Sequence, residues 1–99
     1  MLKPLLFSEL VDPLGARLVG KDVAFEAVSI DSRSVDAGDV FIALTGPRFD
    51  GHDYLEQVAG KGAVGALVER EVAGASIPQL VVADTRQALA QLGALNRNA

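Results

Sequence analysis

Runs of apolar residues separated by polar turns predict a small domain that combines strands with helices. The most continuous run is residues 40–44, which are apolar at every position and have the length of a strand. Such a run is typical of a strand that is covered on both faces. Residues 63–68 and 79–83 are further, mostly apolar runs of strand length. The sequence therefore predicts a sheet whose interior strands are buried.

The first quarter of the chain predicts a helix followed by a hairpin. Apolar residues fall at helical spacing over residues 4–12, and Pro13 and Gly15 should stop that helix. Residues 16–19 and 23–27 lie on either side of a Gly-Lys-Asp turn. This arrangement predicts the two strands of a β-hairpin.

Two more helices complete the predicted fold. One carries apolar residues at helical spacing from Tyr54 and ends at Gly60 or Gly62. It lies between two buried strands, and strand, helix and strand in this order form a βαβ unit with parallel pairing and a right-handed crossover. The last helix begins at Asp84, which forms a capping box with Gln87. The predicted fold class is α/β, with a small mixed, largely parallel sheet of about five strands and about three helices.

A group of polar residues precedes the central strand. The apolar alternation changes phase at Val28, which either a bulge or a separate strand would produce. Ser29, Asp31, Ser32 and Arg33 follow. Hydroxyls and carboxylates of this kind commonly bond neighbouring backbone in turns, and an arginine beside them is usually solvated. The alternative is a recognition edge, where short polar side chains bind a base or ribose and the guanidinium pairs with an anion.

A second polar group follows the central strand, at the strand end where α/β domains bind ligands. Gly46 and Gly51 allow the backbone to approach a ligand, and the helix after them presents N–H groups to an anion. Arg48 and His52 would add charge or donors, so we expect phosphates near them. Asp50 would repel a phosphate, and we therefore assign it to helix capping or to a sugar hydroxyl.

Composition excludes several classes of protein. The chain has 99 residues, enough for one domain, and a formal net charge of −4, which argues against nucleic acid as a partner. It has no cysteine and one histidine, so neither disulfides nor a Cys- or His-rich metal site is expected. The apolar run near the start is too short for a signal-peptide core, and no transmembrane segment is expected. Without a G-x-x-x-x-G-K-[ST] loop, a G-x-S-x-G elbow or an H-E-x-x-H motif, the chain should hold no self-sufficient active site.

The segments around these polar groups resemble the amino-terminal domain of the Mur ligases, which build the peptide of bacterial peptidoglycan. The resemblance rests on residues 29–33, 37–46, 48–54, 62–68 and 78–86, in this order. It covers almost the whole chain from about residue 28 onward. Two of these segments are most similar to the ligases that add D-alanyl-D-alanine to UDP-N-acetylmuramoyl-tripeptide, and the ligase acting one step earlier is the alternative.

The resemblance implies a cytoplasmic bacterial enzyme of three domains. This first domain would bind the UDP end of UDP-N-acetylmuramoyl-tripeptide, a central domain would bind ATP and Mg²⁺, and a carboxyl-terminal domain would bind the incoming amine. The reaction would run through an acyl phosphate. Because the family's ATP-binding loop would come after Ala99, we expect residues 1–99 to be one substrate-binding domain that does not turn over alone.

The resemblance also implies which residues surround the uridine nucleotide. No catalytic residue and no metal ligand is expected among them. Thr45 stands where many relatives carry lysine, which removes one side-chain charge from the expected diphosphate site. The expected binding residues are Ser29, Asp31, Ser32, Arg33, Thr45, Gly46, Arg48, Asp50, Gly51 and His52. A non-catalytic α/β interaction module, which would bind a protein and ignore uridine nucleotides, is the alternative from another class.

Overall fold

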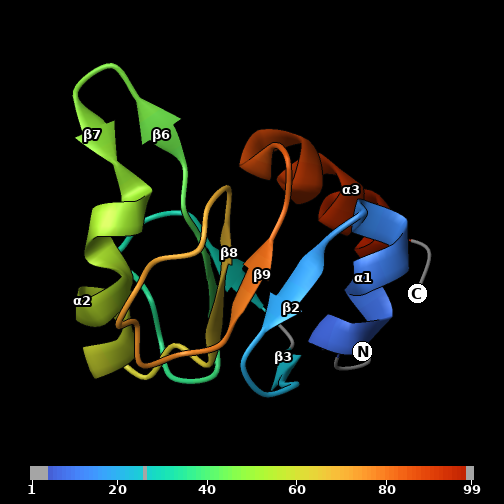
Figure 1. Ribbon diagram of the computed structural model, residues 1–99, viewed down its shortest axis with the longest axis horizontal. Coiled ribbons are helices and arrows are strands. Elements are labelled where there is room, and N and C mark those ends of the chain that lie inside the picture. Colours follow the sequence, from blue (N-terminus) through green and yellow to red (C-terminus); the bar gives the residue numbers. More distant parts are fainter. Residues whose placement is uncertain (1–4, 26, 98–99) are drawn as a thin grey trace.

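A five-stranded mixed sheet organises the chain (Figure 1). The computed structural model describes residues 5–25 and 27–97, with backbone alone for Phe49 and residues 93–97. Along the sheet the order is β2-β9-β8-β5-β4, and all neighbours are parallel except β2 and β9. The strands are β2 (Arg17–Val19), β4 (Val28–Ser29), β5 (Val40–Ile42), β8 (Gly65–Val68) and β9 (Gln79–Val81). The predicted α/β class and largely parallel sheet are confirmed.

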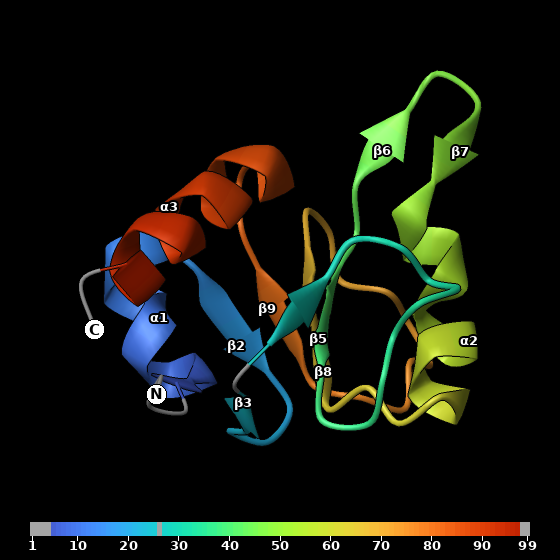
Figure 2. The ribbon, with the colours of Figure 1, turned by 180° about the vertical axis from the view of Figure 1, so that it is seen from behind.

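The sheet has a hydrophobic core on each face. Val40 and Ile42 pack on one side and Phe41 and Ala43 on the other, all of them buried. Helices α1 (Phe7–Leu14) and α3 (Thr85–Arg97) cover the first side, and α2 (Leu55–Gly60) covers the second (Figures 1 and 2). The continuous apolar run in the sequence therefore belongs to a strand covered on both faces, as predicted.

The first helix is displaced from its predicted position. Residues 5–6 form a short strand, β1 (Leu5–Leu6), and α1 begins at Phe7; residue 4 lies outside the described residues. Pro13 lies inside the last turn instead of stopping the helix before it. A proline there removes one intrahelical hydrogen bond, because its nitrogen carries no hydrogen. Gly15, in the left-handed conformation at φ 61°, ends the helix as predicted.

The predicted hairpin of residues 16–27 does not form. Strand β2 pairs with β9, whereas β3 (Ala24–Phe25) pairs with β1 in a separate two-stranded sheet. The turn between β2 and β3 is bonded to the start of α1 instead. Asp22 accepts hydrogen bonds from the backbone N–H of Ser8 at 2.9 Å and from the Ser8 hydroxyl at 2.7 Å. The change of phase at Val28 marks a separate strand, β4, which pairs with β5.

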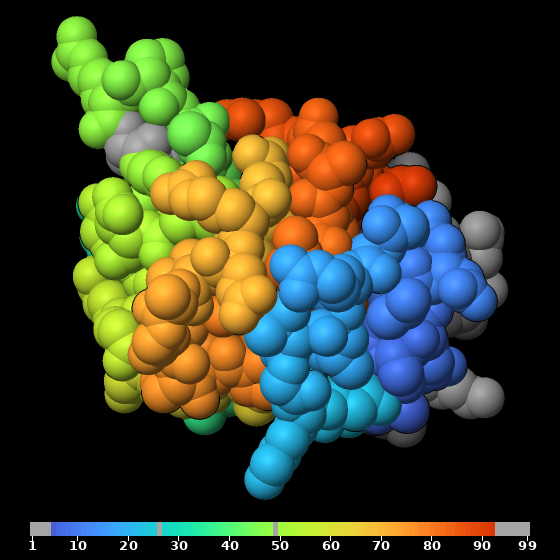
Figure 3. All heavy atoms as spheres, viewed as in Figure 1, coloured from blue at the N-terminus to red at the C-terminus, as the bar shows by residue number. Residues whose placement is uncertain are grey.

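The loop predicted after the central strand contains a hairpin. β6 (Thr45–Gly46) and β7 (Phe49–Asp50) pair antiparallel and project from the body of the molecule (Figure 3). The chain then enters a 3-10 helix, η1 (Gly51–Tyr54), and α2. With β5 and β8 parallel on either side, the predicted βαβ unit is confirmed. Within residues 5–25 and 27–97, no helix has the length and apolar content needed to cross a membrane.

Candidate ligand-binding cleft

A cleft of about 680 Å³ opens beyond the carboxyl ends of β4 and β5. One wall is the segment after β4, which runs toward α2 (Figure 2). The other wall is formed by Gly51, Tyr54 and Gln57 from η1 and α2, and Phe41 and Leu44 add apolar surface. The cleft therefore lies at the sheet edge where open α/β folds bind their ligands.

The first wall is a turn held by its own polar side chains. Asp31 Oδ1 accepts the backbone N–H of Arg33 at 2.9 Å, and the Arg33 guanidinium donates to both oxygens of the same carboxylate at 3.2 Å. Ser29 Oγ donates to the carbonyl of Asp31 at 3.1 Å, and Lys61 Nζ donates to that of Arg33 at 2.9 Å. These contacts preform the wall before any ligand binds.

The ion pair in this wall is exposed to solvent. Its hydrogen bonds lower the pKa of Asp31 and raise the pKa of Arg33. The Arg33 side chain is 85% exposed, so the guanidinium is free to turn from Asp31 toward an anion in the cleft. Turn formation and ligand recognition, which the sequence left as alternatives, are compatible in this wall.

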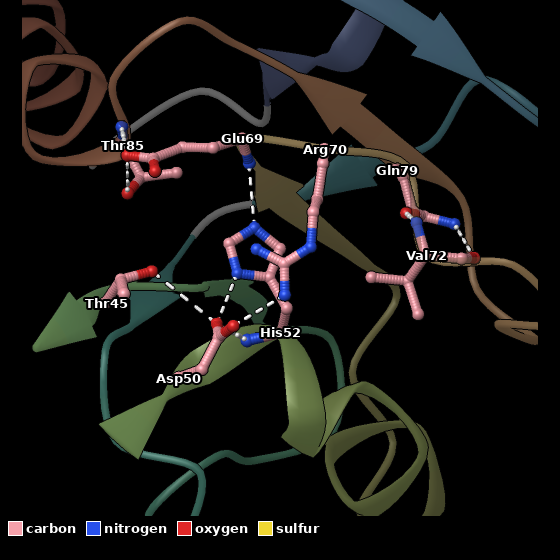
Figure 4. A network of polar contacts seen from close by, with 8 residues as sticks. All are labelled: Thr45, Asp50, His52, Glu69, Arg70, Val72, Gln79 and Thr85. Atoms are coloured by element: carbon pink, nitrogen blue, oxygen red, sulfur yellow. Dashed lines mark hydrogen bonds and ion pairs between the residues drawn. The ribbon is translucent and has the colours of Figure 1, made fainter. Parts of the chain in front are cut away.

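The residue before the second wall, Asp50, carries a carboxylate that joins several segments (Figure 4). Asp50 Oδ1 accepts the backbone N–H of His52 at 3.0 Å and faces its Nδ1 at 2.6 Å, and Asp50 Oδ2 accepts from Arg70 at 2.5 Å. The bond from Arg70 is the largest cause that lowers the pKa of Asp50 below its ordinary range. The predicted capping role of Asp50 is confirmed by its bond to the His52 N–H.

His52 faces the protein interior. It is 3% exposed, and its Nε2 accepts the backbone N–H of Glu69 at 2.9 Å (Figure 4). Because Nε2 faces a donor, the ring proton lies on Nδ1, toward Asp50. Both ring nitrogens are thus engaged inside the chain, and the expectation that the His52 side chain contacts a phosphate is corrected accordingly.

The other predicted residues fall into two groups. Asp31, Ser32, Arg33 and Gly51 line the cleft, and Ser29 supports that wall from β4. Thr45, Gly46 and Arg48 belong to the β6–β7 hairpin and its turn, outside the cleft lining. The structure therefore brings together the first polar group and the start of η1, and it carries the rest of the second group on a projecting arm.

Several lining residues were not predicted from the sequence. Ile30 and Tyr54 are large apolar side chains that are 53% and 37% exposed, and both line the cleft. The sequence places Tyr54 on the apolar face of the helix that follows the central strand and does not indicate that it lines a cleft. The signal for Ile30 was its position among polar residues, where an apolar side chain has no core to enter. Arg70, the partner of Asp50, lies 20 residues further along the chain and gave no local signal.

In the part of the chain that the structure describes, neither the start of α3 nor the arrangement of acidic side chains fits the ATP and Mg²⁺ that the resemblance implies. At the start of α3, Asp84 Oδ1 accepts from the N–H groups of Arg86 and Gln87, and Glu69 Oε2 accepts from that of Thr85. Two carboxylates thus occupy the position that a phosphate would take. The same described residues contain no cluster of three or more histidine, aspartate or glutamate side chains able to hold a metal ion.

Fold and cleft define an α/β domain that is open to a ligand at the carboxyl ends of its parallel strands. The family model described as "Mur ligase family, catalytic domain" matches residues 24–97. The chain is 42% identical over 87 residues to the UDP-N-acetylmuramoyl-tripeptide–D-alanyl-D-alanine ligase of Escherichia coli, covering 88% of this chain and 19% of that protein. The chain belongs to the Mur ligase family.

Solved structures give the same result for the fold. A crystal structure of MurF from Acinetobacter baumannii matches with a TM-score of 0.81 and 41% identity, over 94% of this chain and 21% of that one. The chain is also 40% identical over 72 residues to a UDP-N-acetylmuramoyl-L-alanyl-D-glutamate–2,6-diaminopimelate ligase of Bacillus licheniformis, covering 73% of this chain and 14% of that protein. The chain spans about a fifth, or less, of the length of these relatives.

Proposed function

We propose that this chain is the UDP-binding domain of a bacterial, cytoplasmic ligase that joins D-alanyl-D-alanine to UDP-N-acetylmuramoyl-tripeptide. One observation carries the proposal: a cleft at the carboxyl ends of parallel strands combines exposed apolar side chains with hydroxyl, carboxylate and guanidinium groups. A nucleoside diphosphate needs both kinds of surface. The similarity to ligases named for this reaction supports the choice of substrate.

The two walls suggest how the uridine would bind. Ile30 and Tyr54 offer exposed apolar surface against which a base can lie. Asp31 and Ser32 offer an acceptor and a hydroxyl for the edge of the base or for the ribose, and Arg33 offers a planar donor for an anion. Ser29 would act in part through its bond to the Asp31 carbonyl.

The β6–β7 hairpin would carry the diphosphate contacts. Thr45, Gly46 and Arg48 lie on this arm next to the cleft wall that starts at Gly51. Arg48 is the positive side chain on the arm, and Gly46 leaves its backbone accessible. Asp50 would hold the arm through Arg70 or bind a sugar hydroxyl. The ATP-dependent step and its Mg²⁺ are proposed to require the other parts of a longer ligase.

The ligase that adds the third residue is the second candidate. Its support is the 40% identity to the diaminopimelate ligase of B. licheniformis, close to the 42% for the D-alanyl-D-alanine ligase of E. coli. Both relatives are named for UDP-N-acetylmuramoyl substrates, so a binding experiment with UDP does not separate them. Comparison of the UDP-muramoyl-dipeptide with the UDP-muramoyl-tripeptide in the complete enzyme does.

An NMR titration of this chain tests the proposal. UDP and UDP-N-acetylmuramoyl-tripeptide should shift amide resonances of residues 29–33 and 45–54, with ADP as the control. A domain without the other parts of a ligase is expected to bind as weakly as about 1 mM, roughly −4 kcal/mol, which NMR detects. An equal response to ADP would reduce the site to generic anion binding, and no response to any ligand would favour a protein-interaction module.

A further inference from the structure

His52 lies outside the cleft lining but directly follows Gly51, where the second wall begins. The chain leaves the sheet after Leu44 for the hairpin and returns at Gly51, whose N–H donates to the Leu44 carbonyl at 2.8 Å. His52 follows immediately, and Tyr54 and Gln57 then complete the wall. The side chain that fixes this return point therefore fixes where the wall stands.

The imidazole makes one hydrogen bond on each side. Nδ1 faces Asp50 in β7 at 2.6 Å, and Nε2 accepts the N–H of Glu69, directly after β8, at 2.9 Å. Glu69 is itself held, because its carboxylate accepts from the N–H and the hydroxyl of Thr85 at 3.0 and 3.1 Å. The ring thus joins the base of the hairpin to the neighbouring strand and, through Glu69, to the start of α3 (Figure 4).

We infer that His52 is a positioning residue, a neutral imidazole with its proton on Nδ1, that sets the second wall of the cleft by accepting the Glu69 N–H. This inference rests on the proposed function for its ligand, UDP, but its geometry is independent of any ligand. The bond to Glu69 ties the wall to the sheet. The bond to Asp50 ties it to the base of the hairpin, which reaches the segment after β8 only through the exposed side chain of Arg70.

Two substitutions separate these bonds. In His52→Gln the amide oxygen reaches about as far as Nε2 and can still accept from Glu69, whereas in His52→Asn the short amide reaches only toward Asp50. We expect UDP binding about tenfold weaker in H52N, the effect of about one lost hydrogen bond, and close to wild type in H52Q. Affinities are compared by NMR titration at a temperature where each variant is folded.

Gln79→Met is the matched control for general loss of stability. Gln79 is also buried and holds backbone, because it bonds the N–H and the carbonyl of Val72, away from the cleft lining (Figure 4). This variant should lose stability and keep its affinity for UDP. The positioning role would be overturned if folded H52N bound UDP as tightly as wild type, or if Q79M weakened binding as much as H52N does. It would also be overturned if H52N kept its affinity for UDP and H52Q lost it.

Measurements without ligand keep the inference testable if UDP does not bind or if H52N does not fold. In the wild-type chain, ¹⁵N spectra of the ring should show a protonated Nδ1 and an unprotonated Nε2, and the Glu69 N–H should exchange slowly. In H52Q, exchange of the Gly51 and Glu69 N–H groups should stay slow. A proton on Nε2, or a fast-exchanging Glu69 N–H in the wild-type chain, would overturn the inference and leave the proposed function untouched.

Discussion

At the scale of single residues, the site depends on side chains that bond to each other before they meet a ligand. Arg33 is the clearest case, because it pairs with Asp31 in the same turn and yet is 85% exposed. An exposed pair of this kind contributes little to stability. The pair matters because the preformed turn presents the Arg33 guanidinium at the mouth of the cleft. Removal of the guanidinium should therefore affect ligand binding far more than folding.

Arg33→Ala should therefore weaken binding of UDP by about tenfold, the effect of losing a charge-assisted hydrogen bond, with little change in unfolding temperature. Ser32→Ala should weaken it less, because a neutral hydroxyl is lost. The measurement is an NMR titration alongside thermal unfolding. Arg17→Ala is the matched control, since Arg17 is also exposed and paired, with Glu71 at 3.5 Å. Full affinity in both R33A and S32A would remove these residues from the site.

The structure leaves no room for a side chain at Gly51, whereas it leaves room for one at Gly60. A Cβ on Gly51 would lie 2.8 Å from the backbone N and O of Leu44, whereas nothing lies within 4 Å of a Cβ on Gly60. Gly51→Ala should therefore destabilise the fold by about 2 kcal/mol or more, a typical cost of overpacking. Gly60→Ala, in the last turn of α2, should be neutral or stabilise by up to about 1 kcal/mol. Urea unfolding measures both, and equal effects would contradict the crowding argument.

At the scale of elements, the β6–β7 hairpin is attached to the domain by polar contacts at its base. Asp50 receives Arg70 from the segment after β8 and caps η1. Because a short two-stranded hairpin is marginal in water by itself, these contacts decide its orientation. The attachment is therefore sensitive to the charge of one carboxylate.

The pH dependence of stability should report this carboxylate. Arg70 lowers the pKa of Asp50 in the folded chain, so the stabilisation is complete above the unfolded pKa of about 3.9 and is lost as the pH falls through the folded value. Asp50→Asn keeps the cap but removes the charge, so the variant should be about 1 kcal/mol less stable than wild type at pH 7. Between about pH 4 and pH 2, the stability of the variant should fall less steeply than that of the wild-type chain. Asp53→Asn is the control for charge, and an unchanged acid limb in D50N would contradict the assignment.

The elements differ in how far the sequence predicts them. The central strand and the βαβ unit follow from apolar runs whose length and continuity are typical of doubly covered strands, and both are confirmed. The prediction of a hairpin over residues 16–27 was wrong because the carboxylate of its turn residue, Asp22, bonds Ser8 at the start of α1. These two residues lie 14 positions apart in the sequence. No local pattern encodes the pairing of β2 with β9.

The site shows the same limit. Asp31, Ser32 and Arg33 were predicted because a polar cluster at a strand end is a local feature, and they do line the cleft. The orientation of His52 depends on Glu69, which lies 17 residues away. The β6–β7 hairpin was missed, although its Gly-Pro dipeptide marks a turn.

At the scale of the whole molecule, the first helix closes one face of the sheet. Phe7 is fully buried, stacks edge-on against Phe25 with ring centroids 5.7 Å apart, and packs on β8 at Gly65, where a Cβ would come within 2.7 Å of the Phe7 ring. The family model matches residues 24–97 and so leaves this helix out. The packing makes α1 part of the same core as the matched region.

Phe7→Ala should consequently lower the unfolding temperature of the domain strongly. Such a substitution costs about 3–5 kcal/mol, a large share of the roughly 5–15 kcal/mol expected for a domain of this size. Leu6→Ala is the matched control, because Leu6 is the neighbouring residue and is 39% exposed. Thermal unfolding by circular dichroism measures both variants. A small effect of F7A would mean that residues 24–97 hold the fold without α1.

The aromatic composition of the chain gives the cleft its own optical reporter. Tyr54 is the single tyrosine and there is no tryptophan, so nearly all intrinsic fluorescence of the protein comes from one ring. That ring lines the cleft and is 37% exposed. A nucleobase that stacks on it should quench its emission, whereas a ligand bound elsewhere should leave the emission unchanged. Occupancy of this cleft can thus be followed in the unlabelled protein.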